Sequence, residues 1–392
     1  MGTRIMRNDA AVSTDEAITT ATAKGAMRAG GAARGRRAAR AALALLVTAG
    51  IALTAGCSGR GADTAPVGGE AGATGTPVTS FAIVTPEKES DHGWNQQGIV
   101  GAQQAAEALG IKLEDHSNAG YDNTETILTQ VAESGVGLVI AHASGFNAAG
   151  VRVGEQTGVP TLVVDFENNV PGKVATAIPQ PQQGAYLAGI AAAKKTQTKK
   201  VGIVASAENL NWFLMAGGFA QGVYSVDPSI EVVLAYVGPA NYGDSAGGTS
   251  VTNQVIAAGA DVIMGMGDGA TIGFLQAIET AQTEYPISYI ATIGDVTGMV
   301  ENPDTVLTSV LWNYKDTYVQ AIKDIENGTF GTKSYELTVA NGGLSLQDTP
   351  GLTAETKTAV ADATEAIKSG KVKVAYTDTK EAVQALIDAK GN

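Results

Sequence analysis

Short apolar segments alternate with segments of helical pattern from residue 78 onward, and this alternation limits the fold more than any other feature of the chain. The apolar segments have the length of strands, and most of them lack a polar face. Strands that are apolar on both sides and separated by helices form parallel sheets with helices on both faces. In the first half, the predicted strands are 78–85, 111–115, 136–141, 161–165 and 174–177, and the predicted helices are 95–109, 123–134 and 148–157.

The same alternation begins again near residue 183, so the sequence predicts two similar doubly wound lobes of the α/β class. The charged residues after residue 353 fall on two solvated helices, 355–369 and 379–390, with a strand-like segment at 370–376 between them. In the second half, the predicted strands are 200–205, 230–236, 261–265, 287–294 and 305–311, and the predicted helices are 183–195, 212–223, 247–258, 271–283 and 317–327.

The first 57 residues have the pattern of an export signal. A cluster of arginines ends at Arg40, residues 41–53 are apolar and uncharged, and Ala55-Gly56-Cys57 follows. This order is typical of a secretory signal, and the apolar run is shorter than the roughly 20 residues of a membrane-spanning helix. The ending resembles a bacterial lipobox, which implies cleavage before Cys57 and a diacylglycerol anchor on its thiol. Two points stay open, namely whether translation starts at Met1 or Met27, and whether Arg36-Arg37 directs export by the twin-arginine route.

Residues 58–76 are almost entirely Gly, Ala, Thr, Ser and Pro, which predicts a flexible linker between the anchor and the folded body. Of the 26 Lys and Arg and the 39 Asp and Glu in the chain, residues 1–57 hold eight and three, which leaves 18 and 36 for the rest. A body this acidic repels a phosphate backbone, so we expect no nucleic-acid partner.

Cys57 is the only cysteine, so no disulfide can form within the chain, and we expect no metal and no cofactor. The three histidines, His92, His116 and His142, are far apart and lack the close spacing of metal sites. Their separation also argues against a histidine-based catalytic triad.

Carboxylates, amides and large aromatic residues follow the predicted strand ends in both lobes. Ligands of open α/β sheets bind beyond the carboxyl ends of the strands, so these residues are the candidates for a binding site. Aromatic rings offer flat faces for stacking, and carboxylates accept hydrogen bonds from hydroxyl or ring N–H groups. The same residues also suit helix capping and core packing, and this alternative stays open at each position. The candidates are Asp91, Trp94, Asn95, Phe146, Asp165, Trp212, Phe213, Asp268, Asp295 and Trp312.

Six motifs, taken in order, resemble the basic membrane protein family over residues 80–345. They are Lys-Glu-Ser-Asp-His-Gly-Trp-Asn-Gln-Gln-Gly (88–98), Gln-Gly-Ala-Tyr-Leu-Ala-Gly (183–189) with Val-Gly-Ile-Val (201–204), Gly-Phe-Ala-Gln-Gly (218–222), Gly-Ala-Asp-Val (259–262) and Ile-Gly-Asp (293–295). The resemblance implies a type I periplasmic binding protein, in which three crossovers form a hinge between two lobes. It further implies a lipoprotein that binds purine nucleosides or related small molecules for ABC import.

Carried over by position, the resemblance implies that Asp91 and Asn95 make polar contacts to the ligand beside the aromatic ring of Trp94. Phe213 lies where the family places an aromatic residue across the ligand, and Asp295 matches an aspartate that binds sugar hydroxyls. One departure is that Thr308-Ser309-Val310 is followed by Leu311-Trp312, where the family usually has a lysine. A free base or another ring compound is therefore an open alternative to a nucleoside.

The sequence thus predicts a signal peptide (1–57), a linker (58–76), a first lobe (77–182 with 295–330) and a second lobe (183–294 with 331–392). We expect a monomeric, lipid-anchored protein on the extracytoplasmic side of the cell membrane, with an ABC permease and ATPase as partners and no enzymatic activity. The alternatives are a sugar or autoinducer binder, a sensory solute receptor of the same fold and, from another class, a nucleoside hydrolase.

Overall fold

Two six-stranded sheets form the body of the protein, with strand orders β11-β5-β4-β3-β1-β2 and β12-β10-β9-β8-β6-β7. The computed structural model describes residues 75–390, and these fall within one compact unit. All neighbouring strands run parallel except β10 and β12, which are antiparallel. The two-lobed α/β fold predicted from the sequence is confirmed.

The first sheet is built from elements of the first half of the chain, together with β11. Alternate residues of β1 face opposite sides of this sheet. Phe81 and Ile83 pack with Ile99 of α1, while Ala82 and Val84 pack in a second cluster with Leu128 of α2. The elements are β1 (Ser80–Val84), α1 (Trp94–Leu109), β2 (Lys112–His116), α2 (Thr124–Glu133), β3 (Val139–Ala141), η1 (Ser144–Phe146), α3 (Asn147–Thr157), β4 (Thr161–Val164), β5 (Val174–Pro179) and β11 (Tyr335–Leu337).

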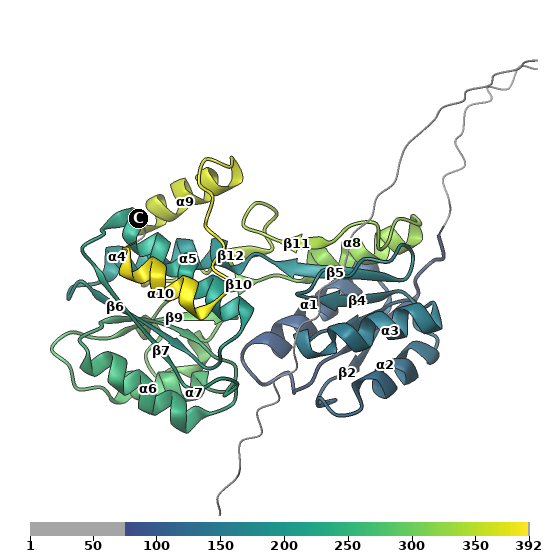
Figure 1. Ribbon diagram of the computed structural model, residues 1–392, viewed down its shortest axis with the longest axis horizontal. Coiled ribbons are helices and arrows are strands. Elements are labelled where there is room, and N and C mark those ends of the chain that lie inside the picture. The colour runs from purple at the N-terminus through teal and green to yellow at the C-terminus, as the bar shows by residue number, and fades with distance from the viewer. Residues whose placement is uncertain (1–74, 391–392) are drawn as a thin grey trace, which may run out of the picture. The chain divides into compact units, whose positions relative to one another are not determined.

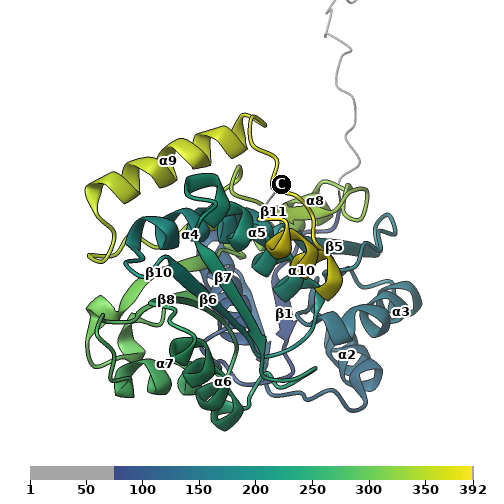
Figure 2. The ribbon, with the colours of Figure 1, turned by 60° about the vertical axis from the view of Figure 1, so that its left-hand side comes forward.

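The second sheet is likewise covered on both faces, by α4 and α5 on one side and by α6 and α7 on the other (Figures 1 and 2). The helices α9 and α10 pack on α4 and α5 respectively. The elements are α4 (Pro181–Lys195), β6 (Lys200–Ala205), α5 (Leu210–Val226), β7 (Glu231–Tyr236), α6 (Ser245–Ala257), β8 (Val262–Met266), α7 (Thr271–Thr280), β9 (Ser288–Ile293), η2 (Thr297–Met299), η3 (Pro303–Thr305), β10 (Val306–Trp312), β12 (Leu344–Leu346), α9 (Ala354–Lys368) and α10 (Lys380–Asp388).

The chain passes between the sheets three times, after β5, after β10 and between β11 and β12. After β10 it enters α8 (Lys315–Glu326), which packs on α1 of the first lobe. Two parts of the predicted lobe assignment are therefore wrong. Strand β10 pairs in parallel with β9 in the second sheet, and β11 pairs in parallel with β5 in the first. The strand-like pattern at 370–376 was also misleading, because this segment forms no strand.

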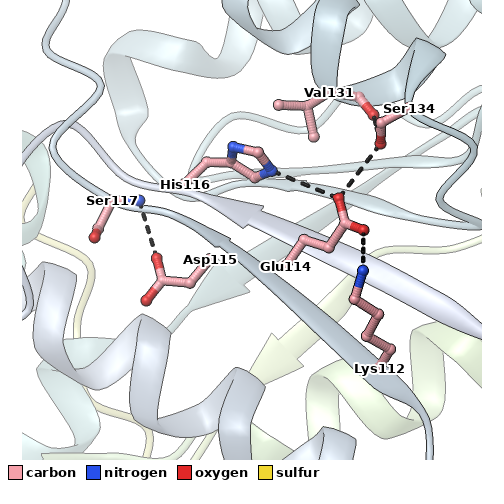
Figure 3. Close-up of polar contacts among 7 residues, drawn as sticks. All are labelled: Lys112, Glu114, Asp115, His116, Ser117, Val131 and Ser134. Carbon is pink, nitrogen blue, oxygen red and sulfur yellow. Dashed lines mark hydrogen bonds and ion pairs between the residues drawn. The ribbon is translucent and has the colours of Figure 1, made fainter.

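The edge strand β2 carries a polar cluster (Figure 3). Glu114 lies 2.8 Å from Lys112 Nζ and 3.7 Å from His116 Nε2, and it accepts a hydrogen bond from Ser134 Oγ. The hydrogen bond from Lys112 keeps the pKa of Glu114 below its ordinary value. Charged side chains on an edge strand oppose pairing with another chain, so this cluster protects the open edge of the first sheet.

Within residues 75–390, no helix combines the length and the apolar character needed to cross a membrane.

Candidate ligand-binding cleft

A cavity of about 350 Å³ lies where strands of both sheets end, and residues of both lobes line it. Its volume is in the range of small-molecule sites. Five of the predicted residues line it, namely Trp94, Asn95, Asp165, Trp212 and Asp268. The other lining residues are Glu87, Tyr121, Ala143, Ser144, Gly145, Phe166, Asn209, Leu210, Asn211 and Tyr242.

Asp91 organises the N-terminus of α1 and does not line the cavity. Its carboxylate accepts hydrogen bonds from the backbone N–H of Asn95 at 2.8 Å and of Gln96 at 2.9 Å. It also accepts one from the Asn95 side-chain amide at 2.7 Å. Of the two roles considered for this residue, the structure shows helix capping, and the capping fixes Asn95 at the cavity wall.

Trp94 is held in the wall by His142, which is fully buried at the end of β3. The two rings stack with centroids 4.9 Å apart, and the Trp94 indole N–H donates to the His142 carbonyl oxygen at 3.1 Å. In return, His142 Nε2 lies 3.0 Å from the Trp94 carbonyl oxygen, and His142 Nδ1 lies 3.0 Å from the Tyr318 hydroxyl. A carbonyl oxygen only accepts, so Nε2 carries the hydrogen and Nδ1 accepts from Tyr318. Burial lowers the pKa of His142 to about 4, so the ring is neutral at pH 7.

Two carboxylates join the lobes at the cavity. Asp268, in the loop after β8, accepts a hydrogen bond from the Trp94 backbone N–H at 3.2 Å. Asp165, directly after β4, accepts one from the Asn211 amide of α5 at 3.2 Å and another from the Ser144 hydroxyl. Burial and the nearby carboxylates of Asp91 and Glu87 raise the pKa of Asp268 to about 7. Burial also raises the pKa of Asp165, against the lowering effect of its hydrogen bonds.

The backbone of Asp165 has φ of 70°, in the left-handed region. Aspartate adopts this conformation more readily than most residues do, and such strain is often found at functional sites. The turn points the carboxylate toward Ser144 and Asn211 and leaves the next residue, Phe166, at the cavity with 52 % of its surface exposed.

Aromatic rings that the sequence analysis did not select add to the lining. Phe166 and Tyr121 remain largely exposed, Tyr121 at 61 %. Tyr242 receives a hydrogen bond from the Asn209 amide at 3.0 Å, and Asn209 in turn caps α5 through the Trp212 N–H. Each of the three aromatic residues lies in a segment that follows a strand end, so a wider use of the strand-end rule would have found them.

The remaining candidates lie outside the cavity lining. Phe146 is fully buried in the first lobe, and Trp312 is buried against Trp94 with ring centroids 5.6 Å apart. Phe213 packs edge-on to Tyr236, with centroids 6.3 Å apart. Asp295 is exposed and accepts from the Thr297 N–H at 2.8 Å, so its carboxylate caps a turn. Cys57 lies outside the described residues.

Two other hollows of about 360 Å³ are less suited to bind a ligand. One lies near the beginning of β1 and has no charged side chain in its lining. The other is a polar groove beside the crossovers, between Asn313 and Glu336. Among residues 75–390, no group of three or more His, Cys, Asp or Glu side chains is placed to hold a metal ion.

Two doubly wound lobes, three crossovers and a cavity at facing strand ends define a two-lobed solute-binding protein. The sequence pattern described as "ABC transporter substrate-binding protein PnrA-like" matches residues 78–378, and the chain belongs to this basic membrane protein family. The family resemblance predicted from the motifs is therefore confirmed.

Curated relatives and solved structures agree with this assignment. The chain is 24 % identical to the ABC transporter nucleoside-binding protein BmpA of Lactococcus lactis, over 78 % of this chain and 91 % of that protein. It is 23 % identical to basic membrane protein A of Borreliella burgdorferi, over 61 % and 69 % of the two chains. A solute-binding protein of an ABC transporter from Aeropyrum pernix has the same fold, with a TM-score of 0.68, 20 % identity and coverage of 80 % and 98 %.

Proposed function

We propose that this protein captures a purine nucleoside, or a related small ring compound, between its lobes and presents it to an ABC permease for import. The observation that supports this proposal most directly is the cavity between the strand ends of the two sheets, which is lined by aromatic, amide and carboxylate side chains from both lobes. Aromatic faces suit a planar base, and the amides and carboxylates suit its N–H groups and sugar hydroxyls. The nucleoside-binding relative from Lactococcus lactis supports this ligand class.

A binding role fits this site better than catalysis does. Its carboxylates accept hydrogen bonds that join the lobes. His142, which stacks on Trp94, is neutral, and each of its ring nitrogens already has a hydrogen-bond partner. We further propose that the mature chain is held at the extracytoplasmic face of the membrane by a lipid on Cys57, because an apolar run and Ala-Gly-Cys precede the linker.

A thermal-shift screen of the purified protein tests the ligand class. Adenosine, guanosine, adenine, guanine and ribose are each added over a range of concentrations, because a ligand of the native state raises Tm by mass action. A shift with nucleosides supports the proposal. A shift with ribose alone would show that the site binds sugars. A shift with free bases alone would show that the ligand is a base without a sugar. Uptake of the radiolabelled ligand by cells with and without the gene then separates import from sensing.

A further inference from the structure

The lining of the cleft cavity is acidic. Its lining contains the carboxyl groups of Glu87, Asp165 and Asp268, and none of the described residues in the lining is Lys, Arg or His. Within residues 75–390, none of these three carboxylates takes part in an ion pair. In the part of the chain that the structure describes, the carboxylates of Asp165 and Asp268 accept hydrogen bonds from neutral donors, namely a backbone N–H, an amide and a hydroxyl.

The buried Asp324 has a cation nearby, unlike the half-buried Asp165 and Asp268. Asp324 accepts hydrogen bonds from Tyr335 and Gln320, and it also lies 3.6 Å from the ammonium of Lys333. Burying a carboxylate without a counter-charge is unfavourable, and placing several together adds repulsion. The raised pKa of Asp268 reflects both effects, because burial, Asp91 and Glu87 all act in the same direction. The cleft therefore gains most from a ligand that brings positive charge.

The aromatic lining has the matching chemistry. Trp94, Tyr121, Phe166, Trp212 and Tyr242 all line the cavity, and two of these rings are more than half exposed. An organic cation is attracted by the negative face of an aromatic ring, and the attraction is larger where water is partly excluded. A neutral hydroxyl can satisfy the acceptors of a carboxylate, but a cation also favours the ionised form of the carboxyl groups, which burial opposes at Asp165 and Asp268.

We infer that the cleft prefers a ring compound with a positively charged nitrogen, protonated or quaternary, over its neutral counterpart, and that it rejects anionic compounds such as nucleotides. This inference rests on the proposed function to the extent that the ligand binds in this cleft, and it names the charge class of that ligand.

Two matched pairs of compounds test the preference. Adenosine is compared with 1-methyladenosine, and nicotinamide with 1-methylnicotinamide; in each pair the second compound is cationic at pH 7.5. We expect calorimetry to show roughly tenfold tighter binding of the cation, with no binding of adenosine monophosphate. In Asp268→Asn, a substitution of nearly equal shape, the ratio of the two affinities should fall toward one. The steric effect of the methyl group is common to both proteins, so it cancels when the ratio in the variant is compared with the ratio in the wild type. Asp295→Asn is the matched control, because Asp295 is exposed and outside the cavity lining.

The outcomes separate this inference from the proposed function. Tighter binding of adenosine than of 1-methyladenosine, with no preference in the second pair, overturns the charge preference and leaves nucleoside capture standing. If 1-methylnicotinamide alone binds, the charge preference is supported and the proposed nucleoside ligand is ruled out. Failure of both cations to bind overturns the inference whatever adenosine does. If Asp268→Asn and Asp165→Asn both keep a preference as large as that of the wild type, the assignment of the preference to these carboxylates is overturned.

Discussion

The Asp268 carboxylate accepts a hydrogen bond from the Trp94 backbone N–H at 3.2 Å, and the two residues belong to different lobes. Trp94 is the first residue of α1, and the N-cap residue, Gly93, provides no side-chain cap. Asp268 therefore supplies a capping acceptor from across the cleft, at the positive end of the helix dipole. This hydrogen bond therefore links the two lobes at the end of a helix.

The first prediction concerns the close approach at Gly93. A Cβ atom at this residue would clash with the Asp268 carboxylate, so Gly93→Ala should displace this carboxylate from its hydrogen bond with the Trp94 N–H. We expect the ligand affinity to fall at least roughly tenfold, measured by calorimetry with the ligand found in the thermal screen. Gly298→Ala is the control, because nothing lies within 4 Å of a Cβ there. Equal affinities of the two variants would contradict this role for Gly93.

The second prediction concerns the exposed aromatic rings of the cleft. Phe166→Ala and Tyr121→Ala should each weaken ligand binding roughly tenfold, because each removes a stacking surface. The free energy of unfolding should change by less than about 0.5 kcal/mol for Phe166→Ala, since its ring is 52 % exposed. Tyr285→Ala serves as the control, as an exposed aromatic residue outside the cavity lining. Unchanged affinity in both cleft variants would show that the ligand does not stack on these rings.

The third prediction follows from the low pKa of His142, about 4 in the folded protein against an ordinary value of 6.5. The unfolded chain binds this proton more readily, so the contribution of His142 to stability is complete above pH 6.5 and is lost as the pH falls toward 4. The loss amounts to roughly 3 kcal/mol at pH 4.

Comparison with His142→Gln isolates this effect. The raised pKa of Asp268 has the opposite effect on stability between about pH 4 and pH 7. In this range the folded state binds the Asp268 proton more tightly than the unfolded chain does, so stability rises as the pH falls. Since Asp268 is present in both proteins, its effect cancels in the difference. Urea unfolding at pH 7, 5.5 and 4 should show the advantage of the wild type shrinking as the pH falls. A constant difference would mean that His142 does not titrate as its environment predicts.

The fourth prediction concerns attachment to the membrane. Cys57→Ser should move the protein from the membrane fraction to the soluble extracytoplasmic fraction, because the proposed lipid needs the thiol. Detergent phase partitioning of cells expressing each protein measures this, with Ser58→Ala as the control. Retention of Cys57→Ser in the detergent phase would rule out lipidation at this residue.

Most of the order of helices and strands was readable from the sequence because most buried strands are short, largely apolar runs, but β11 and β12 were not predicted. The exchange of β10 and β11 between the lobes was not readable, since Val306–Trp312 and Tyr335–Leu337 fit either sheet equally well by pattern. Only the pairing with β9 and with β5 decides their position.

Only some of the candidate site residues line the cavity, because the sequence pattern does not determine where each side chain points. The strand-end rule selected Trp94, Asp165 and Asp268, which line the cavity, and it also selected Phe146 and Asp295, which do not. Proximity to a strand end does not show whether a side chain turns into the core, toward solvent or into the cleft. That choice depends on backbone angles, such as the left-handed turn at Asp165, and on packing between lobes.

The interleaved crossovers also set the order in which the protein can fold. The first sheet lacks one edge until β11 at Tyr335–Leu337 has been added, and the second lacks β12 at Leu344–Leu346. Helix α8, which packs on α1, is also made more than 200 residues after α1. Neither lobe can therefore be completed on the ribosome before most of the chain has been synthesised, and the pairings it needs are long-range and slow to form. A chain that completes its folding late stays unfolded for longer, which suits the proposed export of this protein across a membrane.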